Sequence, residues 1–228
     1  MDATPVLETK GLHKIYHNGA KDLHVIRGID LVVPAGKVMA IVGKSGAGKS
    51  TLLHLLGGLQ PPTQGEVLYC GVNFYQLSEE KRARLRNEKI GFVFQFYHLL
   101  PELTALENVM LPVLIGNSTR RRQAEDRARE LLTRLRLEGR LSHRPSRLSG
   151  GEQQRVAIAR AFIRDPDVVL CDEPTGNLDS KAEQEIYDLI GELNKQSGRS
   201  FLIVTHSERV ASFASEVFRI EDGVLERR

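Results

Sequence analysis

One glycine-rich run in this chain has the residue types and the spacing to hold a phosphate. Residues 43–50 match the pattern GxxxxGK[ST] and follow an apolar stretch directly. In this pattern the glycines let backbone N–H groups turn around a β-phosphate, and the start of the next helix adds positive potential. We expect Lys49 to bridge the β- and γ-phosphates and Ser50 to offer its hydroxyl oxygen to Mg²⁺. The expected nucleotide contacts are Gly43, Lys44, Ser45, Gly46, Ala47, Gly48, Lys49, Ser50 and Thr51.

Two adjacent carboxylates form a second chemical motif. Asp172 and Glu173 end the apolar run that begins at Val168. A strand with that pattern delivers both side chains to the carboxyl edge of a sheet, beside bound phosphates. An acidic pair at a strand end is common on protein surfaces, so the pair gains its weight from following the phosphate-binding run. We expect the two carboxylates to have different roles.

A third run, Leu148-Ser149-Gly150-Gly151-Glu152-Gln153, has the features of a second anion site. It precedes a helix expected to begin near Glu152, and a hydroxyl with free backbone N–H groups at a helix start attracts anions. Ser149-x-x-Glu152 is also a capping box, and the two interpretations can coexist. Both anion sites can serve one triphosphate only if a second copy of the chain lies head to tail with the first.

Alternating strands and helices must position these motifs. Apolar strands are expected at 38–42, 90–94, 168–172 and 201–205, with helices at 51–59, 79–88 and 181–193. This order predicts an α/β fold with right-handed crossovers and a parallel sheet. Residues 6–75 otherwise consist mostly of strands, 96–160 have helical periodicity, and 217–225 are expected to form a hairpin. We expect one domain over 1–228, with a core and β-lobe at 1–95 and 161–228 and a helical lobe at about 96–160.

Composition narrows the class of protein. The chain has 228 residues, 41% of them hydrophobic, which is enough for a sizeable core. A net charge of +3 from 32 basic and 29 acidic residues is nearly balanced, so we expect no nucleic-acid partner, and the basic run 120–122 is expected to be a solvated helix face. Cys70 and Cys171 are expected to be free thiols in a reducing compartment. We expect neither a signal peptide nor a membrane span, so a partner would hold the chain at any membrane.

Taken in order from residue 16 to residue 206, these motifs resemble those of the ATP-binding cassette (ABC) family. The resemblance implies a P-loop NTPase (RecA-like) core with an antiparallel β-subdomain and an inserted α-helical subdomain. It implies an ATPase that uses ATP and Mg²⁺. Asp172 resembles the aspartate that orients Mg²⁺ through water, and Glu173 resembles the general base that polarises the attacking water. In the family, the run at Ser149, Gly150, Gly151 and Glu152 contacts the ATP held by the partner chain.

Four further positions gain a role from the same resemblance. Gln95 is in the place of a glutamine that contacts Mg²⁺ or the attacking water, and His206 in that of a histidine that contacts the γ-phosphate. Asp179 belongs to a run that crosses the dimer seam, although it could equally cap a helix. Tyr16 is in the place of an aromatic residue that stacks on adenine, and the alternative is a half-buried tyrosine on an edge strand.

Three stretches resemble one group within the family. Residues 52–59, 95–109 and 174–179 are similar to those of ATPases that drive lipoprotein release from the bacterial inner membrane, and macrolide exporters and cell-division ATPases share much of this pattern. The resemblance implies a homodimer at the cytoplasmic face of that membrane, beneath two integral membrane subunits contacted around residues 96–114, without direct substrate contact. The alternative for 96–114 is an ordinary helical core.

Overall fold

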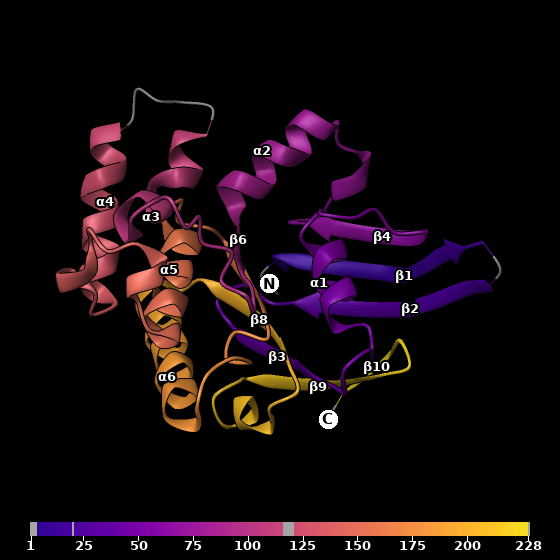
Figure 1. The fold of residues 1–228 in the computed structure, drawn as a ribbon. Coiled ribbons are helices and arrows are strands. Elements are labelled where there is room, and N and C mark those ends of the chain that lie inside the picture. The colour runs from indigo at the N-terminus through magenta and orange to yellow at the C-terminus, as the bar shows by residue number, and fades with distance from the viewer. Residues whose placement is uncertain (1–3, 20, 116–120, 228) are drawn as a thin grey trace.

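The computed structural model describes residues 4–19, 21–115 and 121–227, and within them the strands form two sheets. One sheet has six strands and the other has four. Helices α3 to α6 lie on one side of the larger sheet, and the smaller sheet lies on the other (Figure 1). The expected α/β class is confirmed.

The larger sheet is built around strands that are apolar along their whole length. β3 (Val38–Val42) and β8 (Ser200–Thr205) are buried at every position, as strands covered on both faces must be. The strand order is β10-β9-β3-β8-β7-β6, and every neighbouring pair is parallel except the hairpin of β9 and β10. The remaining strands are β6 (Ile90–Val93), β7 (Val168–Asp172), β9 (Glu216–Glu221) and β10 (Val224–Arg227). The expected strands and the C-terminal hairpin are therefore confirmed.

The register of these strands brings the chemical motifs to one edge of the sheet. Val42 pairs with Thr205, and Asp172 pairs with Val204. The loops that follow β3, β8 and β7 therefore leave the sheet side by side, and the loop after β6 is next to them because β6 pairs with β7. Parallel pairing is what allows four segments far apart in the sequence to build one site.

The smaller sheet is antiparallel, and α1 (Lys49–Leu56) packs between it and the larger sheet. Its strand order is β2-β1-β4-β5, so β1 is an interior strand. α1 ends at Leu56, three residues before the expected end, and Gly57 is its C-cap. A Cβ atom on Gly57 would collide with the ring of Phe92, so this position requires glycine. The strands are β1 (Leu7–Asn18), β2 (Lys21–Val33), β4 (Gln64–Tyr69) and β5 (Val72–Asn73), and α2 (Glu79–Lys89) follows them.

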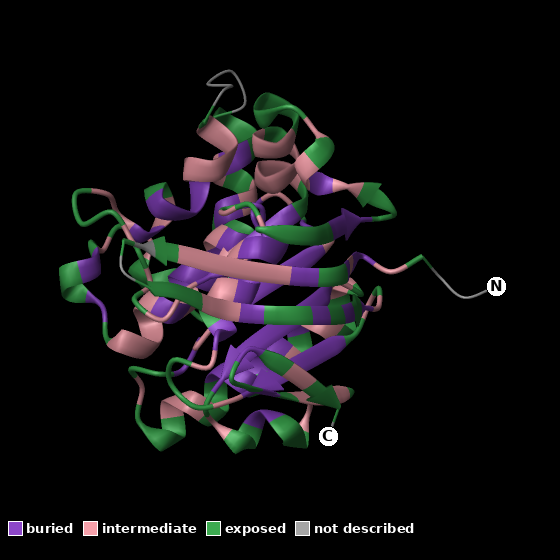
Figure 2. Cartoon of the chain, turned by 90° about the vertical axis from the view of Figure 1, so that its right-hand side faces the viewer, coloured by how far each residue is buried: buried purple, intermediate pink, exposed green. Residues whose placement is uncertain are grey.

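Helices cover the opposite face of the larger sheet. Their buried residues belong to the same hydrophobic cluster as that face, so the helical segment shares the core of the sheet. In Figure 2 the larger sheet is mostly buried, whereas the outer face of the smaller sheet is partly exposed. Of the basic run, Arg120 lies outside the described residues and Arg121 and Arg122 begin α4. The helices are α3 (Ala105–Leu114), α4 (Arg121–Arg134), α5 (Gly150–Phe162) and α6 (Ser180–Ser197).

Among the described residues, no helix combines the length and the apolar character that crossing a bilayer requires.

Candidate active site

The glycine-rich run connects β3 to α1 and leaves the start of that helix open. Gly48 precedes α1 with φ of 104°, a backbone conformation that favours glycine, and no side chain caps the helix. A Cβ atom on Gly48 would lie 3.0 Å from the carbonyl oxygen of Val25, and one on Gly43 only 2.5 Å from that of Ile220. These glycines are therefore required by the shape of the loop, and the first N–H groups of α1 are left free for an anion.

Lys49 points its ammonium group into the loop that precedes it. Its side chain is 7% exposed, and Nζ donates to the carbonyl oxygens of Gly43 at 2.8 Å and Lys44 at 3.0 Å. Nζ also lies 3.2 Å from Oε1 of Glu173, which comes from the next strand but one in the sheet. The ammonium group thus lies where the loop would surround a phosphate.

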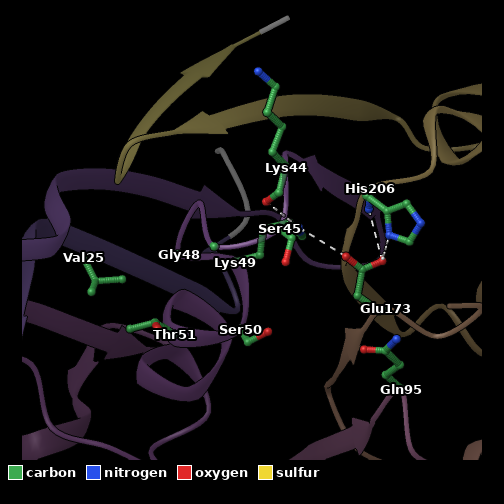
Figure 3. Close-up of a pocket in the computed structure, with 11 residues that line it drawn as sticks. Val25, Lys44, Ser45, Gly48, Lys49, Ser50, Thr51, Gln95, Glu173 and His206 are labelled. Carbon is green, nitrogen blue, oxygen red and sulfur yellow. Dashed lines mark hydrogen bonds and ion pairs between the residues drawn. The ribbon is translucent and has the colours of Figure 1, made fainter.

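Glu173 connects this lysine to His206 (Figure 3). Oε2 of Glu173 accepts a hydrogen bond from the backbone N–H of His206 at 3.1 Å and lies 2.9 Å from its Nδ1. Glu173 itself has a left-handed backbone, with φ of 45°, directly after β7. Residues in such sparsely populated conformations gather at functional sites. The carboxylate is thereby fixed between two cationic or hydrogen-bonding groups from two other loops.

Oxygen ligands for a divalent cation lie beside this pair. The Ser50 hydroxyl donates to Oδ1 of Asp172 at 2.9 Å. Gln95 and Ser50 line one cavity, together with Glu173. Burial raises the pKa of the Asp172 carboxyl, while the hydrogen bond from Ser50 lowers it. No group of three or more His, Cys, Asp or Glu side chains suited to a metal occurs within the described ranges. This donor set fits Mg²⁺, which needs hard oxygen ligands and commonly takes only one or two carboxylates together with phosphates and water.

A cavity of about 590 Å³ joins these groups except Asp172, which does not line it. It is open to solvent and contains most of the residues expected to bind ATP. Gly43 and Ala47 line a neighbouring hollow on the other side of the loop. Val25 also lines the cavity, although its apolar strand position gave no functional signal. The lining residues are Val25, Lys44, Ser45, Gly46, Gly48, Lys49, Ser50, Thr51, Gln95, Glu173 and His206.

Tyr16 does not line this cavity. It is half-buried in β1, its hydroxyl donates to Oε1 of Gln60 at 2.6 Å, and the ammonium group of Lys14 lies 5.1 Å from its ring centroid. β1 lies between β2 and β4 only as far as His13, and at Tyr16 it pairs with β2 alone, so the alternative of a half-buried tyrosine at a strand edge fits this position. Stacking of Tyr16 on adenine remains a prediction.

The second anion motif lies away from the cavity of its own chain. Ser149 caps α5, which begins at Gly150 and not near Glu152 as expected. The capping box is confirmed: Oγ of Ser149 accepts from the N–H of Glu152 at 3.3 Å, and Oε2 of Glu152 accepts from the N–H of Ser149 at 2.8 Å. Arg140 donates to the other oxygen of Glu152 at 2.8 Å. None of these residues lines the cavity.

Asp179 also caps a helix. Its carboxylate accepts from the N–H groups of Lys181 at 3.0 Å and Ala182 at 2.9 Å, at the start of α6. Nearby, the amide of Asn177 donates to the carbonyl oxygen of Gln95 at 2.9 Å. Sequence reasoning missed this contact, since it joins two loops that are far apart along the chain.

Comparisons with known proteins identify the class of the molecule. A profile described as ABC transporter matches residues 26–176. Two curated relatives, the lipoprotein-releasing system ATP-binding proteins LolD of Legionella pneumophila strains Lens and Paris, are each 47% identical over 223 residues, which is 98% of this chain and 98% of each relative. The chain belongs to the ABC transporter family.

Solved structures agree with this assignment. The dimeric structure of MJ0796, a bacterial ABC transporter cassette, is 38% identical with a TM-score of 0.88, over 97% of this chain and 98% of that one. A post-hydrolysis state of the same cassette bound to ADP and Pi is equally similar. The cassette cbiO1 of Clostridium perfringens is 28% identical with a TM-score of 0.86, over 98% of this chain and 88% of that one. The chain is therefore an ATPase with an ABC cassette fold.

Proposed function

We propose that this chain is the ATP-hydrolysing subunit of a membrane complex that releases lipoproteins from the bacterial inner membrane. The full-length similarity to proteins named as lipoprotein-releasing ATPases supports the cargo class. Among the described residues no helix could span a bilayer, which fits a subunit held at the cytoplasmic face by membrane partners.

The residues of the cavity supply the chemistry of hydrolysis. The loop 43–51 binds the phosphates through backbone N–H groups, and Lys49 leaves Glu173 to contact the β- and γ-phosphates. Glu173, freed from that ion pair, accepts the proton of the attacking water, and His206 orients the carboxylate through the bond it already makes. Ser50, Gln95 and, through water, Asp172 would hold Mg²⁺, which would supply positive charge to offset that of the phosphates.

The position of Ser149 carries the proposal of a homodimer. The start of α5 offers a hydroxyl and backbone N–H groups to an anion, yet it does not line the cavity of its own chain. Two copies arranged head to tail bring Ser149, Gly150, Gly151 and Glu152 of one chain to the γ-phosphate held by the other. Asp179, the N-cap of α6, lies at the seam of this dimer. The dimeric cassette MJ0796 is a structural precedent.

A groove of about 960 Å³ beside the helical segment is the proposed contact with the membrane subunits. From the expected range 96–114, His98, Leu111 and Pro112 line it. Further lining residues come from α2 and β6, including Phe92, which lies outside the expected range. A groove lined by both apolar and charged side chains fits an amphipathic segment of a partner.

The variant Glu173→Gln tests the composite site. It should keep ATP affinity, because the general base is not needed for binding, and lose turnover by roughly 10²- to 10⁴-fold. Gel filtration with light scattering should then give the mass of two chains in Mg-ATP and of one chain in Mg-ADP. A single-chain mass in Mg-ATP would refute the head-to-tail site.

Purification from membranes tests the cargo. We expect two integral membrane subunits to accompany the chain, with a periplasmic domain that binds lipoproteins. If the membrane partners belong instead to a macrolide exporter or to a cell-division complex, the function is export or signalling across the membrane and not lipoprotein release.

A further inference from the structure

The turn that follows Gln95 has an unusual backbone. Tyr97 and His98 are consecutive non-glycine residues with φ of 44° and 48°. Left-handed conformations are uncommon outside glycine, and two in succession persist only where surrounding groups hold them. The turn 94–98 is therefore fixed by contacts from elsewhere in the fold.

Arg160 supplies those contacts. Its guanidinium donates from one nitrogen to the carbonyl oxygen of Tyr97 at 2.7 Å and from the other to that of His98 at 2.5 Å. Burial lowers the pKa of Arg160, and no carboxylate pairs with it within the described ranges. Its charge is thus directed at these two carbonyl oxygens. The planar fork of arginine suits two adjacent acceptors, and charge-assisted hydrogen bonds are stronger than neutral ones.

The same turn also contacts the other end of the helix that carries Arg160. Arg160 lies near the last residue of α5, whereas the Tyr97 hydroxyl lies against Gly150, its first residue: a Cβ atom there would be 3.0 Å from the hydroxyl oxygen. The turn therefore contacts α5 near both ends, through the Tyr97 side chain at Gly150 and through the side chain of Arg160. Gln95, which lines the nucleotide cavity, lies within the turn, and Ser149 is the N-cap at the far end of the helix.

We propose that Arg160 is a positioning residue that makes the turn 94–98 and α5 move as one body, so that nucleotide contact at Gln95 reorients Ser149. This rests on the proposed composite ATP site. With the clamp in place, occupation of one cavity prepares the same chain to complete the cavity of its partner. Without these hydrogen bonds from Arg160, Gln95 still contacts nucleotide, but this contact no longer reorients the start of α5.

Arg160→Gln and a matched control, Arg155→Gln, separate this role from simple stabilisation. Arg155 is also on α5 and also ties it to its surroundings, through the Leu135 carbonyl at 3.4 Å and Glu185 at 2.9 Å, but it does not touch the turn. Both variants should be less stable to urea. In case Arg160→Gln does not fold, Arg160→Lys keeps the charge and loses the two-pronged fork.

Hydrogen–deuterium exchange of the purified full chain gives the direct readout, at a protein concentration where light scattering shows one chain. In the wild type and in Arg155→Gln, Mg-ATP should slow exchange both at 94–98 and at the first turn of α5. In Arg160→Gln, Mg-ATP should slow exchange only at 94–98. In Arg160→Lys, part of the ATP-dependent slowing of exchange at the first turn of α5 should remain. Steady-state kcat of Arg160→Gln should fall about tenfold, with KM for ATP within about twofold of the wild type.

Two results would overturn the proposal. One is that Mg-ATP still protects the start of α5 in Arg160→Gln. The other is an equal fall of kcat in Arg155→Gln and Arg160→Gln, which would assign the effect to general stability. By contrast, a wild type that binds no Mg-ATP, or that shows no ATP-dependent dimer as Glu173→Gln, would refute the proposed function itself.

Discussion

Two helix starts in this chain can attract an anion, and they are built in opposite ways. α1 has glycine as its N-cap, no side-chain cap and no acidic residue in its first turn. α5 has Ser149 as its N-cap, a complete capping box and Glu152 in its first turn. The start of α1 lines the nucleotide cavity, where the ammonium group of Lys49 lies within the loop that would surround a phosphate. The start of α5 lies outside this cavity. The first is thus open to a ligand from its own chain, while the capping box of the second already satisfies the N–H groups of Ser149 and Glu152.

α3 shows that the cap alone does not make an anion site. Thr104 and Glu107 form the same reciprocal capping box at its start. Unlike α3, α5 has two consecutive glycines after the cap, and Arg140 donates a hydrogen bond to the glutamate of its box. Because a serine hydroxyl can accept a backbone N–H while donating its own hydrogen, Ser149 can cap α5 and still bind a phosphate. Function at α5 therefore rests on what surrounds the cap.

The largest expected effect is at the open helix start. Lys49→Ala removes the charge that would contact the β- and γ-phosphates, so hydrolysis should fall on the order of 10³-fold, with weaker ATP binding by calorimetry. Lys44→Ala is the comparison, since its side chain points away from Glu173 in Figure 3 and the loop contacts phosphate through its backbone. Similar losses in the two variants would contradict the role assigned to Lys49.

The two capping boxes give the next effect. Ser149→Ala and Thr104→Ala should each destabilise the chain by about 1 kcal/mol, measured by urea unfolding. Only Ser149→Ala should also slow hydrolysis, on the order of 10²-fold, because a donor to the γ-phosphate is lost. If both variants keep their activity, Ser149 is only a cap.

The smallest effect is a pH dependence of stability shared by the two boxes. The hydrogen bond from Arg140 and then that from Ser149 lower the pKa of Glu152, and the hydrogen bonds from Thr104 lower that of Glu107. A carboxyl whose folded pKa lies below its unfolded value stabilises the fold above the unfolded pKa, and that contribution disappears as the pH falls through the folded pKa. In urea unfolding, the free energy of unfolding should fall less between pH 6 and pH 3 for Glu152→Gln than for the wild type. An identical pH profile would mean that Glu152 titrates alike in the folded and unfolded chain.

The motifs that form the site at the start of α1 are predictable from sequence because each is a short local pattern. Spacing alone identified the loop 43–50, and the apolar run before Asp172 identified the strand that delivers Glu173. Parallel pairing then required these loops to meet at one edge of the sheet, as the register shows. The capping box of α5 was also predictable, since its two partners are three residues apart.

Contacts between distant loops were not predictable in this way. The donation from Arg160 to Tyr97, the bond from Asn177 to Gln95 and the bond from Tyr16 to Gln60 each join segments without any periodic relation. Backbone direction at Tyr97 and His98 depends on those contacts, because the residue types themselves favour no left-handed turn. Such features become visible only when the packing of the helical segment on the core is known.

A mixing experiment tests most directly whether the nucleotide cavity at the start of α1 in one chain works with the start of α5 in another chain. Lys49→Ala lacks a working cavity and a Ser149→Phe chain lacks a working second anion site, so each should be nearly inactive alone. In a mixed dimer, the cavity of the Ser149→Phe chain faces the intact α5 start of the Lys49→Ala chain. With random pairing, the mixture should recover roughly a quarter of the wild-type ATPase rate. A mixture no more active than its two components would contradict the composite site.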